Sequence, residues 1–161
     1  MRVPQYSKLD TLVGILKEEL ADTFKGGIWT KKILVFDERK TDTENLALRL
    51  NTSDILAKTM NANRQQFERE TSLEQFRKGI CPVLVATSVA ARGLDISGVD
   101  LVINYQLPCG YDKNGRPHLT TDRRIAFYVQ RIGRTGRVGN RGRAISFFDP
   151  QSFDRDIGHE F

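Results

Sequence analysis

The sequence predicts an α/β protein with a mostly parallel central sheet and helices on both faces of that sheet. Two observations lead to this fold class: short continuous apolar runs recur along the chain, and amphipathic segments with helical spacing separate them. A continuous apolar run is typical of a strand that is buried on both faces, as the strands of a parallel sheet are. The length of 161 residues is that of one domain.

The first half of the chain shows this alternation. Residues 9–20 carry apolar side chains on one helical stripe, and Gly26-Gly27 follows as a helix stop and loop. The run Ile33–Phe36 predicts a buried strand. Thr41–Glu44 has the pattern of a capping box, which would open a helix that ends near residue 50.

The second half continues the alternation. Its expected elements are a strand at 55–59, a helix at 65–78, strands at 83–86 and 101–103, a helix at 123–131 and a strand at 144–148. Leu73, Phe76 and Ile80 are spaced for burial against the sheet. Phe36 and Phe67 are, like Phe76, interpreted as core aromatics.

The composition narrows the class of protein. Lys and Arg outnumber Asp and Glu by 25 to 20, and the net charge of +5 points to a polyanionic partner. Two cysteines are too few for a disulfide framework and form no metal-ligand pattern with the two histidines, so we expect a reducing, intracellular setting and no metal site. No apolar run is long enough to cross a membrane and no secretory signal opens the chain, so we expect no membrane contact.

Seven arginines and no acidic residue lie between residues 123 and 143. They are Arg123, Arg124, Arg131, Arg134, Arg137, Arg141 and Arg143. Glycines are interleaved with them, and glycine leaves backbone N–H groups uncovered, while the planar arginine fork suits phosphate oxygens. The stretch therefore predicts a phosphate-binding surface, and a solvated charged face is the alternative.

Two strings around this stretch have the character of a family signature: TSVAARGLDI at residues 87–96 and QRIGRTGRVG at residues 130–139. Together with ILVF before Asp37 and FRKG at residues 76–79, they resemble the second RecA-like domain of the DEAD-box RNA helicases. SKLDTLVGIL and GRAISFFDP are most similar to the Vasa-like members. The resemblance implies a RecA-like three-layer fold over residues 1–161.

The resemblance implies half of a two-domain motor that closes around ATP with Mg²⁺. This chain would supply arginine fingers for hydrolysis and half of the track that binds single-stranded RNA. It contains neither a G-x-x-x-x-G-K-[ST] string nor a DEAD string. The N-terminal RecA-like domain that holds most of the nucleotide is therefore expected outside this chain, as its partner, and the isolated domain is predicted to be inactive.

The resemblance also assigns residues to the nucleotide site. Arg134 and Arg137 are implied to reach the γ-phosphate, where a guanidinium stabilises the charge that phosphoryl transfer develops. Asp95 is implied to accept a hydrogen bond from the ribose, with capping of a turn as its alternative role, and Gly93 is assigned to the same site. Gln130, counted with the catalytic residues, stands where the family usually has His.

Six residues share an implied contact with RNA. They are Arg39, Arg64, Gln66, Arg69, Thr87 and Arg92. Gln66 and Arg69 match the family's Q-x-x-R element, and Thr87 and Arg92 belong to its motif V. Exposed charges are the alternative for Arg69 and Arg92, and a structural ion pair is the alternative for Arg131.

Segment 109–122 is polar, rich in turn residues and longer than the usual link between a strand and a helix. Two interpretations stay open: a mobile surface loop, and an insertion that contacts RNA or a protein partner. Gln106 and Gln130 stand where the family usually has Asp and His. These two residues, with the insertion as a partner site, keep a second function open: a non-catalytic RNA-binding or scaffold protein on the helicase fold. A cytoplasmic or nuclear location is expected, and the Vasa-like resemblance adds perinuclear germ granules.

Overall fold

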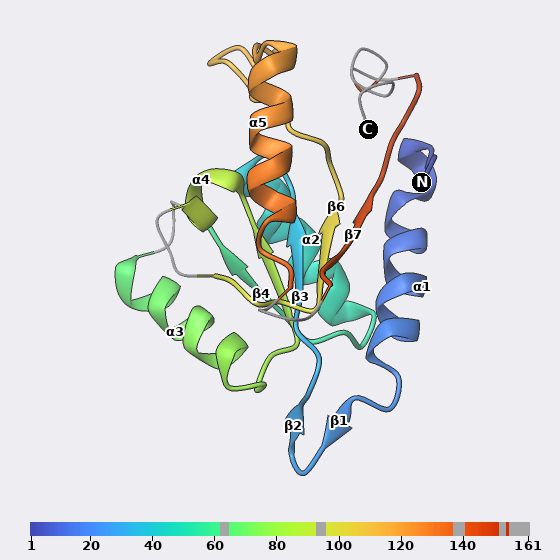
Figure 1. The fold of residues 1–161 in the computed structure, drawn as a ribbon, viewed down its shortest axis with the longest axis vertical. Coiled ribbons are helices and arrows are strands. Elements are labelled where there is room, and N and C mark those ends of the chain that lie inside the picture. The colour runs from blue at the N-terminus through green and yellow to red at the C-terminus, as the bar shows by residue number, and fades with distance from the viewer. Residues whose placement is uncertain (62–64, 93–95, 137–140, 152–153, 155–161) are drawn as a thin grey trace.

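The computed structural model describes residues 1–61, 65–92, 96–136, 141–151 and 154. A sheet of five parallel strands forms its centre, with helices around it (Figure 1). In spatial order the strands are β4 (Ala57–Met60), β5 (Val83–Ala86), β3 (Ile33–Phe36), β6 (Leu101–Asn104) and β7 (Arg143–Ser146). The helices are α1 (Lys8–Leu20), α2 (Lys40–Thr52), α3 (Gln66–Arg77), α4 (Ser88–Arg92) and α5 (Thr121–Ile132), with a 3₁₀ turn at Gln5–Ser7. The predicted α/β class is confirmed.

The sheet buries a separate apolar core on each face, because successive side chains of a strand point to opposite sides. Ile33 and Val35 of β3 pack in one core with residues of α1 and α2. Leu34 and Phe36 pack in the other core with residues of α3 and α4. All four residues of β3 are buried, as its continuous apolar run predicts. The two cores separate three layers, with helices on each side of the central sheet, as the predicted fold requires.

The segment after α1 differs from the prediction. α1 ends at Leu20, and Gly26 and Gly27 form the turn between two short antiparallel strands, β1 (Phe24–Lys25) and β2 (Ile28–Trp29). Both glycines have positive φ, 61° and 81°. A helix stop at these glycines is therefore wrong: a two-residue hairpin turn with positive φ at both central positions favours glycine there.

The start of α2 also differs. The helix begins at Lys40, and Arg39 occupies its N-cap position without a side-chain cap. The Thr43 hydroxyl donates to Lys40 O at 2.6 Å. The capping box at 41–44 is wrong, because its residues already lie inside the first turn of the helix.

Helix α3 confirms two of its predicted core residues. Leu73 and Phe76 are buried. Ile80 is 51% exposed, because Gly79 with φ of 75° ends the helical path and the spacing no longer applies beyond it. Phe67 is 76% exposed and borders an open groove between α2 and α3, so its assignment to the core is wrong.

Other differences are small. The strand expected at 55–59 is shifted toward the carboxyl end as β4, the one expected at 144–148 is shifted toward the amino end as β7, and α4 is an additional short helix. Across the described residues, every helix is too short or too polar to cross a membrane. Within that same part of the chain, no three His, Cys, Asp or Glu side chains gather where they could hold a metal ion.

Candidate functional site

The candidate site lies at the carboxyl edge of the sheet. The parallel register sets Phe36 opposite Ala86 on one side and Asn104 on the other. The residues that follow β3, β5 and β6 therefore gather at one edge. Parallel sheets bind ligands at this edge.

A buried arginine of α5 ties this edge together. The Arg131 guanidinium forms an ion pair with Glu38, which follows β3, and both side chains are less than a tenth exposed. It also donates to Ser88 Oγ (2.7 Å), Asn104 Oδ1 (3.2 Å) and Gln106 O (2.7 Å). Burial lowers the pKa of Arg131, and the Glu38 carboxylate opposes that shift. The ion-pair interpretation of Arg131 is confirmed.

Sequence reasoning missed the two acidic residues at the end of β3. Asp37 is 3% exposed, and its Oδ1 accepts a hydrogen bond from Glu38 N at 2.8 Å. Burial raises the pKa of the Asp37 carboxyl to about 6. The available signal was two acids directly after a buried apolar run, at the edge where ligands bind.

Arg134 follows the carboxyl end of α5 and is half-buried. Its guanidinium donates to Ile96 O at 3.4 Å. A small hollow between α4 and α5 is bordered by Arg134, Arg92 and the exposed Gln130. The Arg92 guanidinium stacks 4.7 Å from the centre of the Phe127 ring. The structure thus brings three predicted site residues to one hollow.

The predicted surface of seven arginines is smaller than expected. Arg124 and Arg131 are buried, two helical turns apart on the same face of α5. Arg124 forms an ion pair with Asp154 at 3.3 Å and donates to Pro108 O. The phosphate-binding prediction is wrong for these two arginines, because an amphipathic helix must turn one face toward the fold. Arg123 remains exposed.

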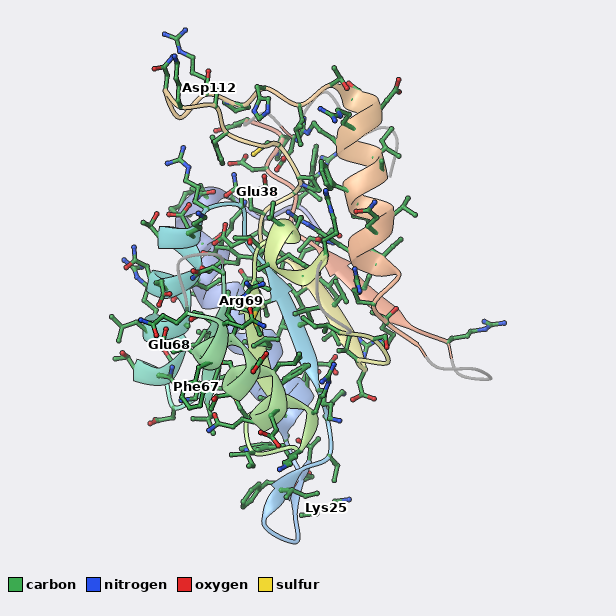
Figure 2. The ribbon with its side chains drawn as sticks, turned by 90° about the vertical axis from the view of Figure 1, so that its left-hand side faces the viewer. Lys25, Glu38, Phe67, Glu68, Arg69 and Asp112 are labelled. Carbon is green, nitrogen blue, oxygen red and sulfur yellow. The ribbon has the colours of Figure 1, made fainter. Side chains whose placement is uncertain are left out.

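Two of the predicted RNA contacts lie together at the start of α3. Arg69 donates to Gln66 Oε1 at 3.5 Å, and within the described chain its buried Nε has no hydrogen-bond partner. Figure 2 shows Arg69 on α3, below Glu38 in that view. Thr87 is 6% exposed and accepts a hydrogen bond from Ala90 N, so its hydroxyl stabilises the start of α4.

Four predicted site residues lie outside the described residues: Arg64, Gly93, Asp95 and Arg137.

Segment 109–122 contains a hairpin, and we call residues 109–119 the insertion hairpin. Its base is anchored by Glu38, whose Oε2 accepts hydrogen bonds from Cys109 N (3.1 Å) and Gly110 N (2.8 Å). The exposed Arg39 meets it from the start of α2, with its guanidinium 3.9 Å from the centre of the Tyr111 ring. These contacts fix the base of the segment, and its contact with RNA or a protein partner stays a prediction.

Comparison with known proteins agrees with this architecture. Residues 12–139 match the model of the helicase conserved C-terminal domain. The chain is 45% identical to the ATP-dependent RNA helicase DDX4 of Mus musculus over 94% of its own length, and 42% identical to the ATP-dependent RNA helicase glh-1 of Caenorhabditis elegans over 91%. It spans 18% and 17% of those two relatives, so it corresponds to less than a fifth of each.

Solved structures show the same fold. The structure of the E. coli DEAD-box protein SrmB bound to the regulator of ribonuclease activity RraA has a TM-score of 0.76 at 28% identity, and the match covers 99% of this chain and 82% of the chain in that structure. The structure of S. cerevisiae Dbp5 bound to RNA and ADP BeF3 has a TM-score of 0.75 at 30% identity, and the match covers 98% of this chain and 36% of the chain in that structure.

Proposed function

Since the chain belongs to the helicase conserved C-terminal domain family, in its DEAD-box branch, we propose that it is the second motor domain of an ATP-dependent RNA helicase. A companion N-terminal RecA-like domain binds most of the ATP with its Mg²⁺, and this chain closes on it with cationic side chains. RNA lies across both domains and is bent when they close. Short duplexes are separated in this way.

The hollow between α4 and α5 is the observation that carries this proposal. There, Arg134 lies beside Arg92 and Gln130. Its guanidinium makes one hydrogen bond within the described chain, to Ile96 O, which leaves other N–H donors for phosphate oxygens. In phosphoryl transfer a guanidinium so placed stabilises charge on the equatorial oxygens and raises the rate by about 10³–10⁵-fold. Cationic side chains suit phosphate and repel Mg²⁺, so the metal is assigned to the companion domain.

The remaining roles rest on the family motifs. Arg137 acts as a second finger, and Asp95 and Gly93 form the ribose side of the nucleotide site. The RNA track of this chain uses phosphate and 2′-hydroxyl contacts, which carry no sequence preference. Its proposed residues are Arg39, Arg64, Gln66, Arg69, Thr87 and Arg92.

Arg134→Ala tests the finger role in the full-length protein, which on this proposal carries the companion domain. We expect RNA-stimulated ATP turnover to fall by about 10³-fold or more. The melting temperature should stay near that of the wild type, because the side chain is half-exposed and makes one long hydrogen bond. Lys25→Ala, an exposed cation in β1, is the control for loss of charge. Turnover within about tenfold of the wild type would refute the finger assignment.

A second function is favoured by Gln130, whose exposed side chain forms no hydrogen bond within the described part of the chain. A non-catalytic RNA-binding or scaffold protein would bind RNA without turnover. Gln130→His separates the two functions. RNA binding with no ATP turnover, unchanged by Gln130→His, would support the scaffold and contradict the motor.

An intracellular location, including the germ granules that the Vasa-like resemblance implies, completes the proposal. A fluorescent fusion of the full-length protein, imaged in germ cells, would test it. A diffuse signal outside granules would contradict the granule assignment.

A further inference from the structure

We propose that the insertion hairpin extends the RNA-binding surface beyond the sheet edge and contacts the RNA backbone with Lys113 and Arg116. The inference rests on the proposed function, because it lengthens the same RNA track. Contacts of this kind respond to phosphate charge and not to base sequence.

The insertion hairpin is an ordered element. Three backbone hydrogen bonds of 2.8 to 3.2 Å run between its two sides, joining Leu119 to Cys109, His118 to Gly110, and Asp112 to Arg116. Its base is fixed by the two hydrogen bonds to Glu38, and Glu38 is itself held by an ion pair with α5. The tip is therefore held at a defined place, and ordering it on binding costs little conformational entropy.

The acidic groups near the tip are engaged, whereas the cationic groups are free. Asp112 Oδ1 accepts hydrogen bonds from Asn114 N and Arg116 N, both at 2.8 Å, and Glu38 is nearly buried in its ion pair. The side chains of Lys113 and Arg116 are exposed, and neither has a hydrogen-bond or ion-pair partner in the described ranges. The tip consequently presents positive charge to solvent.

Arg39 connects the hairpin to the proposed track. Its guanidinium stacks on Tyr111 and donates to a backbone oxygen of the hairpin turn at 3.3 Å. Stacking orients the planar fork while its outer edge stays exposed, which suits a phosphate. In the view of Figure 2, Glu38, the chain neighbour of Arg39, lies between Arg69 on α3 and Asp112 at the hairpin turn. Because the Arg39 guanidinium contacts the hairpin turn, an RNA strand bound at Arg39 would continue to the tip.

The test compares two double variants that remove equal charge. Lys113→Ala/Arg116→Ala removes the hairpin cations, and Lys17→Ala/Lys25→Ala removes two exposed lysines elsewhere; Figure 2 shows Lys25 at the opposite end of the molecule from Asp112. Fluorescence anisotropy measures the affinity of this chain for labelled oligouridylates of about 6 and about 15 nucleotides. The longer RNA should reach the hairpin, and the shorter one should not. Titrations are repeated over a series of salt concentrations. All four altered side chains are exposed, so folding should be unaffected, which far-UV circular dichroism checks.

With the longer RNA, the hairpin variant should lose about fivefold in affinity per contact at 0.1 M salt, or about 25-fold in all, because each contact to a single strand contributes about 0.7 to the slope of log K against log salt. That slope should fall by about 1.4, while the shorter RNA and the control variant change by less than about twofold. Equal losses of RNA affinity in both variants, or no loss in the hairpin variant, would overturn the proposal. The second result would favour a protein partner, and not RNA, as the ligand of the hairpin. Absence of salt-dependent RNA binding by the wild-type chain would instead refute the proposed function itself.

Discussion

Glu38→Gln removes one charge of the ion pair that joins α5 to the end of β3. The variant keeps an acceptor oxygen for the backbone N–H groups of Cys109 and Gly110 but leaves the buried guanidinium of Arg131 without its ion-pair partner, with the charge of Asp37 nearby but not paired to it. Arg131 is 2% exposed, so water cannot replace the lost carboxylate. The perturbation therefore isolates the electrostatic part of the contact.

Removing one partner of a buried pair costs about 3–5 kcal/mol, because the remaining charge stays uncompensated. We expect Glu38→Gln to lie near the lower end, about 3 kcal/mol, since three neutral acceptors still bond Arg131. Arg131→Met should cost a similar amount by leaving Glu38 buried alone. The double variant should cost clearly less than the sum, because neither charge is then stranded.

Urea unfolding followed by circular dichroism measures the free energy of unfolding of all three variants. Glu74→Gln is the matched control, because it breaks the exposed pair with Lys78 on α3 and should leave the urea midpoint unchanged. A loss for Glu38→Gln no larger than that of Glu74→Gln, or strict additivity in the double variant, would refute the argument.

Three further predictions concern stability and are measured by the same unfolding assay. Burial raises the pKa of Asp37 from 3.8 to about 6, so its ionisation destabilises the fold progressively between about pH 4 and pH 6 and by a constant amount at higher pH. Asp37→Asn should therefore be more stable than the wild type by up to about 3 kcal/mol at pH 7.5 and by about half of that at pH 5; a gap that does not narrow on acidification would contradict this. Gly79→Ala should cost at least about 1 kcal/mol, because φ is 75° and the new Cβ would lie 2.5 Å from Trp29 O; an unchanged midpoint would mean that the β1–β2 hairpin moves aside freely. Phe76→Ala should cost about 3–5 kcal/mol and Phe67→Ala almost nothing, since the first ring is buried and the second is exposed; similar losses would contradict the burial of these rings.

The sequence predicted the fold most reliably where the chain is most uniformly apolar. Ile33–Phe36 and Val83–Ala86 are central strands, and their boundaries were correct because polar residues or proline flank each run. The edge strands β4 and β7 are shifted from their expected ranges, because a strand with one neighbour carries exposed residues that blur its limits.

Errors arose where a local pattern has two structural meanings. Thr41–Glu44 fits a capping box, but the same residues fit the interior of a first helical turn. Helical spacing places Ile80 in the core only if the helix continues, and the positive φ of Gly79 ends it. Hydrophobic character alone did not decide the position of Phe67, which borders a groove instead of the core.

Long-range pairing limited the prediction of the site. Arg131 was open to an ion-pair role, but its partner Glu38 lies 93 positions away and no local pattern names it. The same holds for Arg124 and Asp154. The nucleotide roles of Arg134 and the RNA roles of Arg69 came from motif order and stay predictions.

The anchoring of Cys109 gives the protein a built-in chemical reporter. Burial raises the pKa of this thiol to about 11, so near neutral pH the sulfur is held as the unreactive thiol. Any event that detaches the base of the insertion hairpin from the Glu38 carboxylate would expose the Cys109 sulfur to water. The pKa of the thiol would then fall toward that of a free cysteine. The rate of alkylation by a maleimide, with the equally shielded Cys81 as an internal reference, would therefore time the opening of this corner of the molecule without any engineered label.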